Sequence, residues 1–234
     1  MATNAQIITA VARAVSDPDF QQRSGAIYAQ ILTDAMDFII DSTECMRKSD
    51  TSLTLVAGTQ EYNLPTRFIK FPSMYSEVKT PVALGTDGKI TTIPSSVILL
   101  NQLEVGWRGA ADGTPQYHYL ILEGTAKVGF HPAPSSSFIS TYGSSVYLDM
   151  VFRSEDIADN SSSPFDSSTM LRSLQFLLKL RALWQIRLEN KEYSDADRYD
   201  KMVKEELERA KEFVESIMAT PGEHGFVQQF GGSV

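Results

Sequence analysis

The residues that most often do chemistry are sparse in this sequence and do not occur at a catalytic spacing. The one cysteine, Cys45, lies in an apolar segment of helical pattern, and a catalytic cysteine would need a histidine partner. Each of the three histidines, His118, His131 and His224, lacks a second ligand two to four residues further on, the spacing typical of zinc sites. We therefore expect Cys45 to be a buried structural residue and His118 to lie on the surface of a sheet.

Carboxylates are the abundant reactive groups. Asp34, Asp37 and Asp41 recur three and four residues apart, which places them on one face of a helix. Such a group could hold a divalent metal or act in a hydrolase, although a solvated face or a subunit contact is the simpler interpretation. The glycines at 85–89 lack the spacing of a phosphate-binding loop and indicate a surface turn. We predict no metal, no cofactor and no enzymatic activity.

The composition is that of a globular protein with a negative charge. The 234 residues suffice for one large domain or two small ones. The net charge is -8, and no Lys/Arg cluster of the kind that grips DNA phosphates occurs. No apolar run reaches the ~20 residues of a membrane span, and the N-terminus lacks a signal-peptide pattern. We expect a protein that is made in a cytoplasm and does not enter a membrane.

Hydrophobic periodicity predicts helices, then strands, then helices, which is an α+β fold. In residues 1–50, Thr3 and Gln6 have the spacing of a capping box, the first helix should end before Pro18, and a second helix should run from about 23 to 46. Residues 51–153 hold most of the prolines and glycines, and we expect them to form a small antiparallel β sandwich or barrel-like region. The strand candidates are 53–56, 62–64, 68–71, 117–122, 127–130 and 145–152.

The C-terminal segment 154–220 is expected to complete a helical bundle with the N-terminal helices. Ser163, Pro164 and Asp166 are typical of a helix start. The helix that follows, to about Glu189, is apolar almost all round, so more than one neighbour must cover it.

A second start at Ser194 predicts a break near 190–193 and then an amphipathic helix. Four apolar residues of these two helices are candidates for packing between subunits: Leu177, Leu180, Trp184 and Phe213. Residues 221–234 have too little apolar surface to fold alone and are expected to form a flexible tail.

Three short motifs in the central region carry a family resemblance. They are Val-Ala-Gly-Thr-Gln-Glu-Tyr-Asn-Leu-Pro at 56–65, Gly-Thr-Pro-Gln-Tyr at 113–117, and Gly-Phe-His-Pro-Ala-Pro at 129–134, each followed by strand pattern. In this order, between helical segments, they resemble the head-to-tail adaptor (connector, or head-completion) proteins of tailed bacteriophages. That family has terminal helices around a β insert with G-x-Q-x-Y-x-L-P and P-x-P elements.

The resemblance implies a structural protein of the virion, made in the host cytoplasm and placed at the head–tail junction. Such adaptors form a dodecameric ring beneath the portal protein, extend the channel through which double-stranded DNA passes, and receive a tail tube, nozzle or further connector. Their C-terminal segment commonly docks onto the portal, which makes Phe226 and Phe230 the candidate docking residues. The alternative is a carbohydrate- or receptor-binding β module, with aromatic strand residues as its surface, on a helical oligomerisation scaffold.

Overall fold

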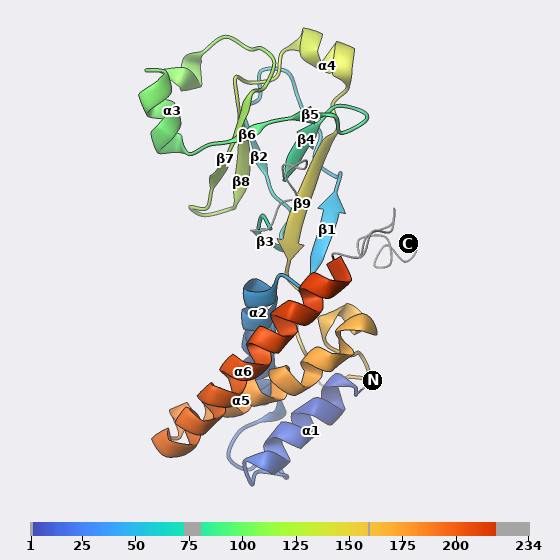
Figure 1. The fold of residues 1–234 in the computed structure, drawn as a ribbon, viewed down its shortest axis with the longest axis vertical. Helices are drawn as coiled ribbons and strands as arrows, with labels where there is room; N and C mark the ends of the chain where they lie inside the picture. The colour runs from blue at the N-terminus through green and yellow to red at the C-terminus, as the bar shows by residue number, and fades with distance from the viewer. Residues whose placement is uncertain (1, 73–80, 159, 219–234) are drawn as a thin grey trace. The chain divides into compact units, whose positions relative to one another are not determined.

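The chain folds into two compact units, one of them inserted into the other. The computed structural model describes residues 2–72, 81–158 and 160–218. Unit 1 comprises Met1–Met46 and Phe152–Val234, and unit 2 comprises Arg47–Val151. The chain therefore leaves unit 1 after Met46 and returns to it at Phe152 (Figure 1). Helices dominate unit 1 and strands dominate unit 2, so the predicted α+β fold class is confirmed.

Unit 1 is a helical bundle of α1 (Asn4–Ala14), α2 (Gly25–Thr43), α5 (Leu174–Glu189) and α6 (Tyr193–Met218) (Figure 1). α5 contacts the other three helices, and α2 also contacts α1 and α6. This confirms that more than one neighbour covers α5. The buried side chains at the centre include Ile7, Ile8, Val11, Leu32, Met36, Ile39, Leu177, Leu178 and Ile186.

The start of α1 follows the sequence prediction. The Thr3 hydroxyl accepts a hydrogen bond from the Gln6 amide at 3.3 Å, and the Gln6 side chain accepts one from the Thr3 amide at 3.0 Å. This capping box satisfies two amides that the first turn leaves without helical partners. α2 begins after Ser24 and ends before Glu44, which caps its C-terminus with a left-handed φ of 54°.

The predicted helix start at Ser163 is wrong. Phe165, Asp166 and Ser167 have φ values of 55°, 50° and 62°, and two short 3₁₀ turns, η2 (Phe165–Ser167) and η3 (Met170–Ser173), precede α5. The Asp166 carboxylate does not cap a helix, because it accepts hydrogen bonds from the Ser154 hydroxyl at 2.7 Å and the Glu155 amide at 2.9 Å. The predicted break between α5 and α6 is confirmed, since α5 ends at Glu189 and α6 begins at Tyr193.

Unit 2 contains two β sheets. The first has the order β1 (Arg47–Asp50), β9 (Val146–Phe152), β4 (Val82–Leu84), β5 (Ile90–Thr91), and β3 (Phe68–Lys70) also pairs with β9. The second has the order β2 (Glu61–Asn63), β8 (Lys127–His131), β7 (Tyr117–Ile121), β6 (Ile93–Pro94).

Three details of the predicted β region need correction. β6 runs parallel to β7, so the second sheet is mixed rather than antiparallel, and the described strands form no closed barrel. The segment 53–56 is not a strand of either sheet, because Thr54 forms an isolated bridge with Ser145. A two-residue strand with Pro94 in it is confined to a sheet edge, since proline cannot donate to the ladder.

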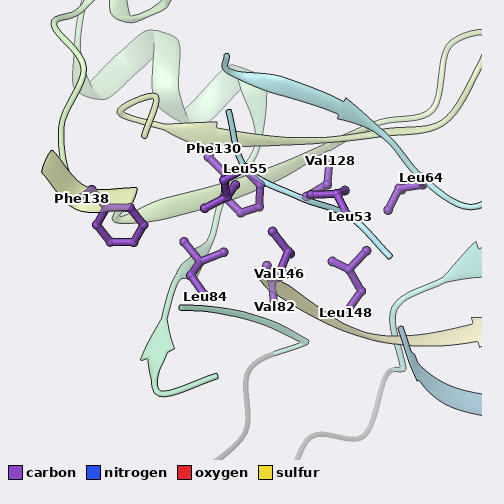
Figure 2. Packing of buried hydrophobic residues seen from close by; sticks show 10 residues of the cluster. All are labelled: Leu53, Leu55, Leu64, Val82, Leu84, Val128, Phe130, Phe138, Val146 and Leu148. Carbon is purple, nitrogen blue, oxygen red and sulfur yellow. The ribbon is translucent and has the colours of Figure 1, made fainter. Parts of the chain in front are cut away.

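The core of unit 2 lies between the two sheets (Figure 2). Alternate residues of β4, β8 and β9 point into it, which is the period-two pattern of strands with one buried face. Each fully buried aliphatic or aromatic side chain contributes roughly 1.5–3 kcal/mol relative to exposure. The ten buried members are Leu53, Leu55, Leu64, Val82, Leu84, Val128, Phe130, Phe138, Val146 and Leu148.

Candidate assembly surfaces

A short helix, α3 (Val97–Leu103), lies on the outer face of the second sheet, followed by the 3₁₀ turn η1 (Trp107–Gly109). The Ser96 hydroxyl caps α3 by accepting a hydrogen bond from the Leu99 amide at 3.1 Å. Leu100, Trp107 and Tyr119 form a buried cluster that joins the helix to β7. The Trp107 and Tyr119 rings meet edge to face at 5.0 Å, so α3 is fixed to the sheet by its inner side.

Polar contacts hold the segment after α3 in place. The Trp107 Nε1 donates a hydrogen bond to Asn101 Oδ1 at 2.7 Å. His131, at the end of β8, is buried, and its Nε2 lies 3.0 Å from Glu104 Oε2. His131 also contacts the Trp107 ring edge to face at 5.5 Å. The turn from α3 to η1 is therefore tied to the sheet at both ends.

Several apolar side chains on α3 and just after it face solvent, where Asn101, Gln102 and Glu104 are exposed as well. Ile98, Leu99, Leu103 and Val105 are 72%, 44%, 58% and 97% exposed, and we call these four residues the α3 patch. Isolated exposed aliphatics are ordinary, but a contiguous group of them marks an interaction site. This surface was not predicted from the sequence. Its signal is a short helix that follows a serine cap and is apolar on both sides.

The four predicted packing candidates on α5 and α6 divide into two kinds. Leu177 and Leu180 are buried within the described chain. Trp184 and Phe213 are half-buried and retain exposed area. Phe176, one residue before Leu177, is exposed. Trp184, Phe213 and Phe176 are therefore accessible on the surface of the helical unit, whereas Leu177 and Leu180 support α5 from inside.

Trp184 belongs to a stack of two aromatic rings and a guanidinium group. The Arg181 Cζ lies 3.8 Å from the centre of the Trp184 ring and 4.2 Å from that of Phe38. Burial lowers the pKa of Arg181, and the nearby Asp200 carboxylate opposes that shift. Trp and Arg are both enriched among the residues that contribute most binding energy at protein interfaces.

The exposed face of α6 is charged and internally paired. Lys204 lies 2.6 Å from Asp200 and Lys211 lies 2.9 Å from Glu208. Exposed pairs of this kind contribute about 0.3–0.5 kcal/mol each on a helix. Ala196, Val203 and Ala210 line the opposite, buried side at intervals of seven residues, so α6 is amphipathic as predicted.

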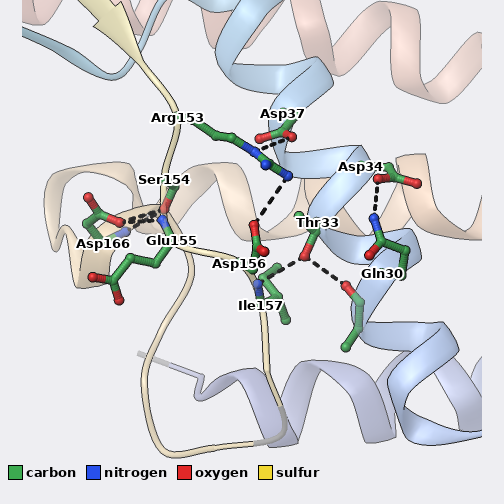
Figure 3. A network of polar contacts seen from close by, with 11 residues as sticks. Gln30, Thr33, Asp34, Asp37, Arg153, Ser154, Glu155, Asp156, Ile157 and Asp166 are labelled. Atoms are coloured by element: carbon green, nitrogen blue, oxygen red, sulfur yellow. Dashed lines mark hydrogen bonds and ion pairs between the residues drawn. The ribbon is translucent and has the colours of Figure 1, made fainter. Parts of the chain in front are cut away.

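The aspartates of α2 have structural partners rather than a metal-like arrangement (Figure 3). Arg153 lies 2.7 Å from Asp37 and 3.2 Å from Asp156. Burial raises the pKa of Asp37, although the Arg153 guanidinium opposes the shift. Asp34 accepts a hydrogen bond from Gln30 at 2.7 Å. Among the described residues, no group of three or more His, Cys, Asp or Glu side chains could hold a metal ion.

The comparison with known families agrees with this architecture. The model of the family described as SU10 adaptor protein matches residues 2–221. The chain belongs to the SU10 adaptor family. The match spans the N-terminal helices, both sheets and α5 with α6, and it confirms the predicted membership among phage head-to-tail adaptors. No curated protein matches the chain.

The predictions for Cys45, His118, Phe226 and Phe230 of this SU10 adaptor protein can be compared with the structure one by one. Cys45 is buried as predicted, and burial raises the pKa of its thiol to about 12 despite an opposing hydrogen bond with Thr43. The prediction for His118 is wrong. Its side chain is buried rather than on the sheet surface, and its Nδ1 lies 2.9 Å from the Thr92 hydroxyl. Phe226 and Phe230 lie outside the described residues.

The described helices of the SU10 adaptor protein include none with the length and apolarity needed to cross a membrane. The aromatic strand residues that a sugar-binding surface would need are partly withdrawn from solvent. Tyr119 is buried under α3, and Tyr117 is half-buried and stacked on His131 with ring centres 6.4 Å apart. Membership of a structural adaptor family favours a role in assembly over catalysis.

Proposed function

We propose that this SU10 adaptor protein is a ring-forming component of the virion head–tail junction. It binds the portal protein, extends the DNA channel and gives tail components their attachment site. The family match over residues 2–221 carries this proposal. Rings require each subunit to meet its two neighbours through two different surfaces, and the helical unit keeps accessible aromatic side chains on both α5 and α6.

Unit 1 supplies the contacts between copies in this proposal. Trp184 and Phe213 are half-buried in one chain, and Phe176 is exposed. Covering them with a neighbouring helix removes apolar area from water. The ring contains twelve copies, and the tail from 221 onward docks onto the portal through Phe226 and Phe230.

The charge of the chain suits passage of DNA without capture. The net charge is -8, and a channel wall of the same sign as DNA phosphates provides no counterion release to hold them. The DNA therefore slides through the ring without sequence-specific contacts. The component on the other side of the ring is a tail tube, a nozzle or a further connector.

Reconstitution with the portal tests this function. Purified chain and purified portal protein, mixed and analysed by size-exclusion chromatography with light scattering, should give a complex of the portal and a ring of this chain, visible by electron microscopy. A monomeric free chain is compatible with the proposal, since rings of this kind can form on the portal. A chain that never joins the portal at any ratio would contradict it. A matched pair of variants, Phe226→Ser with Phe230→Ser against Val227→Ser, should separate portal docking from a general effect on the tail.

A further inference from the structure

A small polar cavity in the helical unit lies between the start of α1 and the chain that returns from the β unit. Its volume is about 200 Å³, which is enough for an ion with several water molecules. Asn4 lines it from the helix, and residues of the segment 154–167 line the rest. We infer that this cavity binds one Ca²⁺ ion, which joins α1 to the returning segment. This site goes beyond the proposed function and does not rest on it.

The first argument is a buried oxygen atom. Asn4 is 3% exposed, and its Oδ1 has no hydrogen-bond partner in the part of the chain that the structure describes. The Asn4 Nδ2 donates a hydrogen bond of 3.1 Å to Asn160 Oδ1, which also accepts one from the Ser162 amide. Turning the Asn4 amide over would set two acceptor oxygens against each other, so its orientation is fixed. A buried acceptor left unpaired costs free energy, and Oδ1 therefore indicates a donor or a cation as its ligand.

The second argument concerns the amides at the start of α1, which could otherwise attract an anion. Those of Thr3 and Gln6 are used in the capping box. The Asn4 amide donates to the Ser162 carbonyl at 2.7 Å, and the Ala5 amide donates to the Asn160 carbonyl at 3.2 Å. A helix start binds phosphate or sulfate through amides that still need an acceptor. All four amides of this first turn already have one, so the helix start favours no anion here.

The third argument is charge. The described residues that line the cavity include three carboxylates, Glu155, Asp156 and Asp166, and no Lys, Arg or His. Asp156 turns toward Arg153, 3.2 Å away, whereas Glu155 and Asp166 lie on the other side of the same segment (Figure 3). Hydrogen bonds from the Ser154 hydroxyl and the Glu155 amide hold Asp166 in place. Two carboxylates outweigh the partial positive charge of roughly half an elementary charge at a helix start.

The fourth argument is the type of ligand atom. The side chains around the cavity offer amide, hydroxyl and carboxylate oxygens, which suit hard cations, whereas zinc prefers nitrogen and sulfur. Ca²⁺ accepts six to eight oxygens in irregular geometry, including amides and water, but Mg²⁺ demands a near-ideal octahedron. This mixed set differs from a group of three acidic or histidine ligands, which the described residues do not form.

The expected affinity is low, because only Glu155 and Asp166 bring a negative charge that Arg153 does not already pair. Sites with few charged ligands have Kd values on the order of 0.1–1 mM. The ligands come from the two ends of the helical unit, since Asn4 is separated from Glu155 by the whole β unit. They are together only in the folded chain, so bound Ca²⁺ stabilises the helical unit.

The test measures Ca²⁺ binding to the full chain after treatment with EDTA and dialysis. Isothermal titration calorimetry should show one saturable site per chain with a Kd on the order of 0.1–1 mM. Circular dichroism at 222 nm follows the helices, and about 10 mM CaCl₂ should raise their melting temperature by at least ~3 °C relative to NaCl of equal ionic strength. Mg²⁺ should bind at least ~10-fold more weakly than Ca²⁺.

Two variants each remove one proposed ligand, Glu155→Gln and Asn4→Ala. Each should weaken Ca²⁺ binding at least ~10-fold. Asp34→Asn is the matched control, because it removes the same charge from an exposed position of the same unit, and it should bind Ca²⁺ like the wild type. Glu155 is exposed, so Glu155→Gln keeps the test decisive even where Asn4→Ala disturbs the start of α1.

Three results would overturn the inference. The first is the absence of saturable Ca²⁺ binding up to about 20 mM, well above the expected Kd. The second is Ca²⁺ binding that Glu155→Gln retains in full, which would place the ion elsewhere. The third is a saturable response to methylammonium chloride without one to CaCl₂, which would make the ligand an ammonium group.

Discussion

The hydroxyl of Tyr28 donates a hydrogen bond of 2.9 Å to a carboxylate oxygen of Asp17. Both side chains are buried, and the same carboxylate accepts hydrogen bonds from the amides of Gln21, Gln22 and Arg23 at 2.7–3.0 Å. One aspartate therefore organises the whole connection between α1 and α2 and attaches it to the first turns of α2.

Tyr28→Phe should lower the free energy of unfolding by about 1–2 kcal/mol, because it removes one hydrogen bond to a charged group and leaves the ring packed. Chemical denaturation followed by circular dichroism measures this loss. Tyr193→Phe provides the control, since Tyr193 is exposed. Equal effects of the two substitutions would contradict the importance of the Asp17–Tyr28 bond.

Asp17 should make the helical unit sensitive to acid. Burial alone would raise the pKa of Asp17, but hydrogen bonds from the Gln22, Arg23 and Gln21 amides and the Tyr28 hydroxyl lower it overall. A carboxyl with a lowered folded-state pKa stabilises the fold above the unfolded pKa, and this contribution disappears as the pH falls below about 4. Melting curves from pH 7 to pH 2.5 should show a smaller loss of stability in Asp17→Asn than in the wild type. Asp19→Asn, an exposed neighbour, should follow the wild-type curve.

Gly129 should be required for the position of α3. A Cβ added there would lie 2.1 Å from Cζ of the Tyr119 ring, and this ring supports Trp107. We expect Gly129→Ala to cost about 1–3 kcal/mol, the range for overpacking in a core, and to shift the fluorescence of Trp107 to the red. The measurement needs a Trp184→Phe background so that Trp107 alone reports. Gly109→Ala, where an added Cβ meets nothing within 4 Å, should change neither property.

His118 should make the β unit less stable below neutral pH. Burial lowers the pKa of His118 to about 4, against an opposing hydrogen bond with Thr92. The unfolded chain takes up a proton near pH 6.5, whereas the folded chain resists protonation until about pH 4. The contribution of neutral His118 to the free energy of unfolding is fully present above pH 6.5. It falls by about 3 kcal/mol as the pH is lowered to 4. In His118→Gln the slope of stability against pH over this window should be smaller, and an unchanged slope would show that His118 is accessible to protons.

Trp184→Glu should prevent the copies from assembling into a ring without unfolding the subunit. The half-buried indole stacks on Arg181, and a carboxylate at this place would bring a charge into the proposed contact between copies. We expect at least a 10-fold loss of ring formation on the portal by light scattering, with a melting temperature within a few degrees of the wild type. Tyr193→Glu, at an exposed position, should assemble normally. Normal assembly of Trp184→Glu would remove Trp184 from the proposed interface.

Much of the helical unit follows from local signals in the sequence. The capping box at Thr3, the stripe of α2 and the break before Tyr193 depend on residues close together in the chain, so periodicity and caps predict them. The start of α5 could not be predicted in this way. Asp166 bonds to Ser154 and Glu155, twelve and eleven residues earlier, and these contacts exist only after the chain has folded back.

The β unit was harder to predict because its decisive contacts are long-range. β9 pairs with β1, almost 100 residues earlier in the chain, and with β4. The parallel pair of β6 and β7 has no turn signal, since the intervening chain forms α3. The same reason explains why the burial of His118 was not predicted, because its hydrogen-bond partner Thr92 lies 26 residues away in the chain. The exposed side of α3 was missed because an apolar run in a sequence suggests a core rather than a surface.

The two ends of the β unit lie next to each other. Arg47 and Val151 are antiparallel partners, and just beyond them the Phe152 amide donates a hydrogen bond of 3.0 Å to the Met46 carbonyl. A short turn from Met46 to Phe152 could therefore close the helical unit with no gap to span. An insertion with adjacent ends can be replaced as a cassette by recombination, because the host scaffold keeps its geometry whatever is carried between the two strands. A chain built in this way can exchange its β module for another while its helical unit stays unchanged.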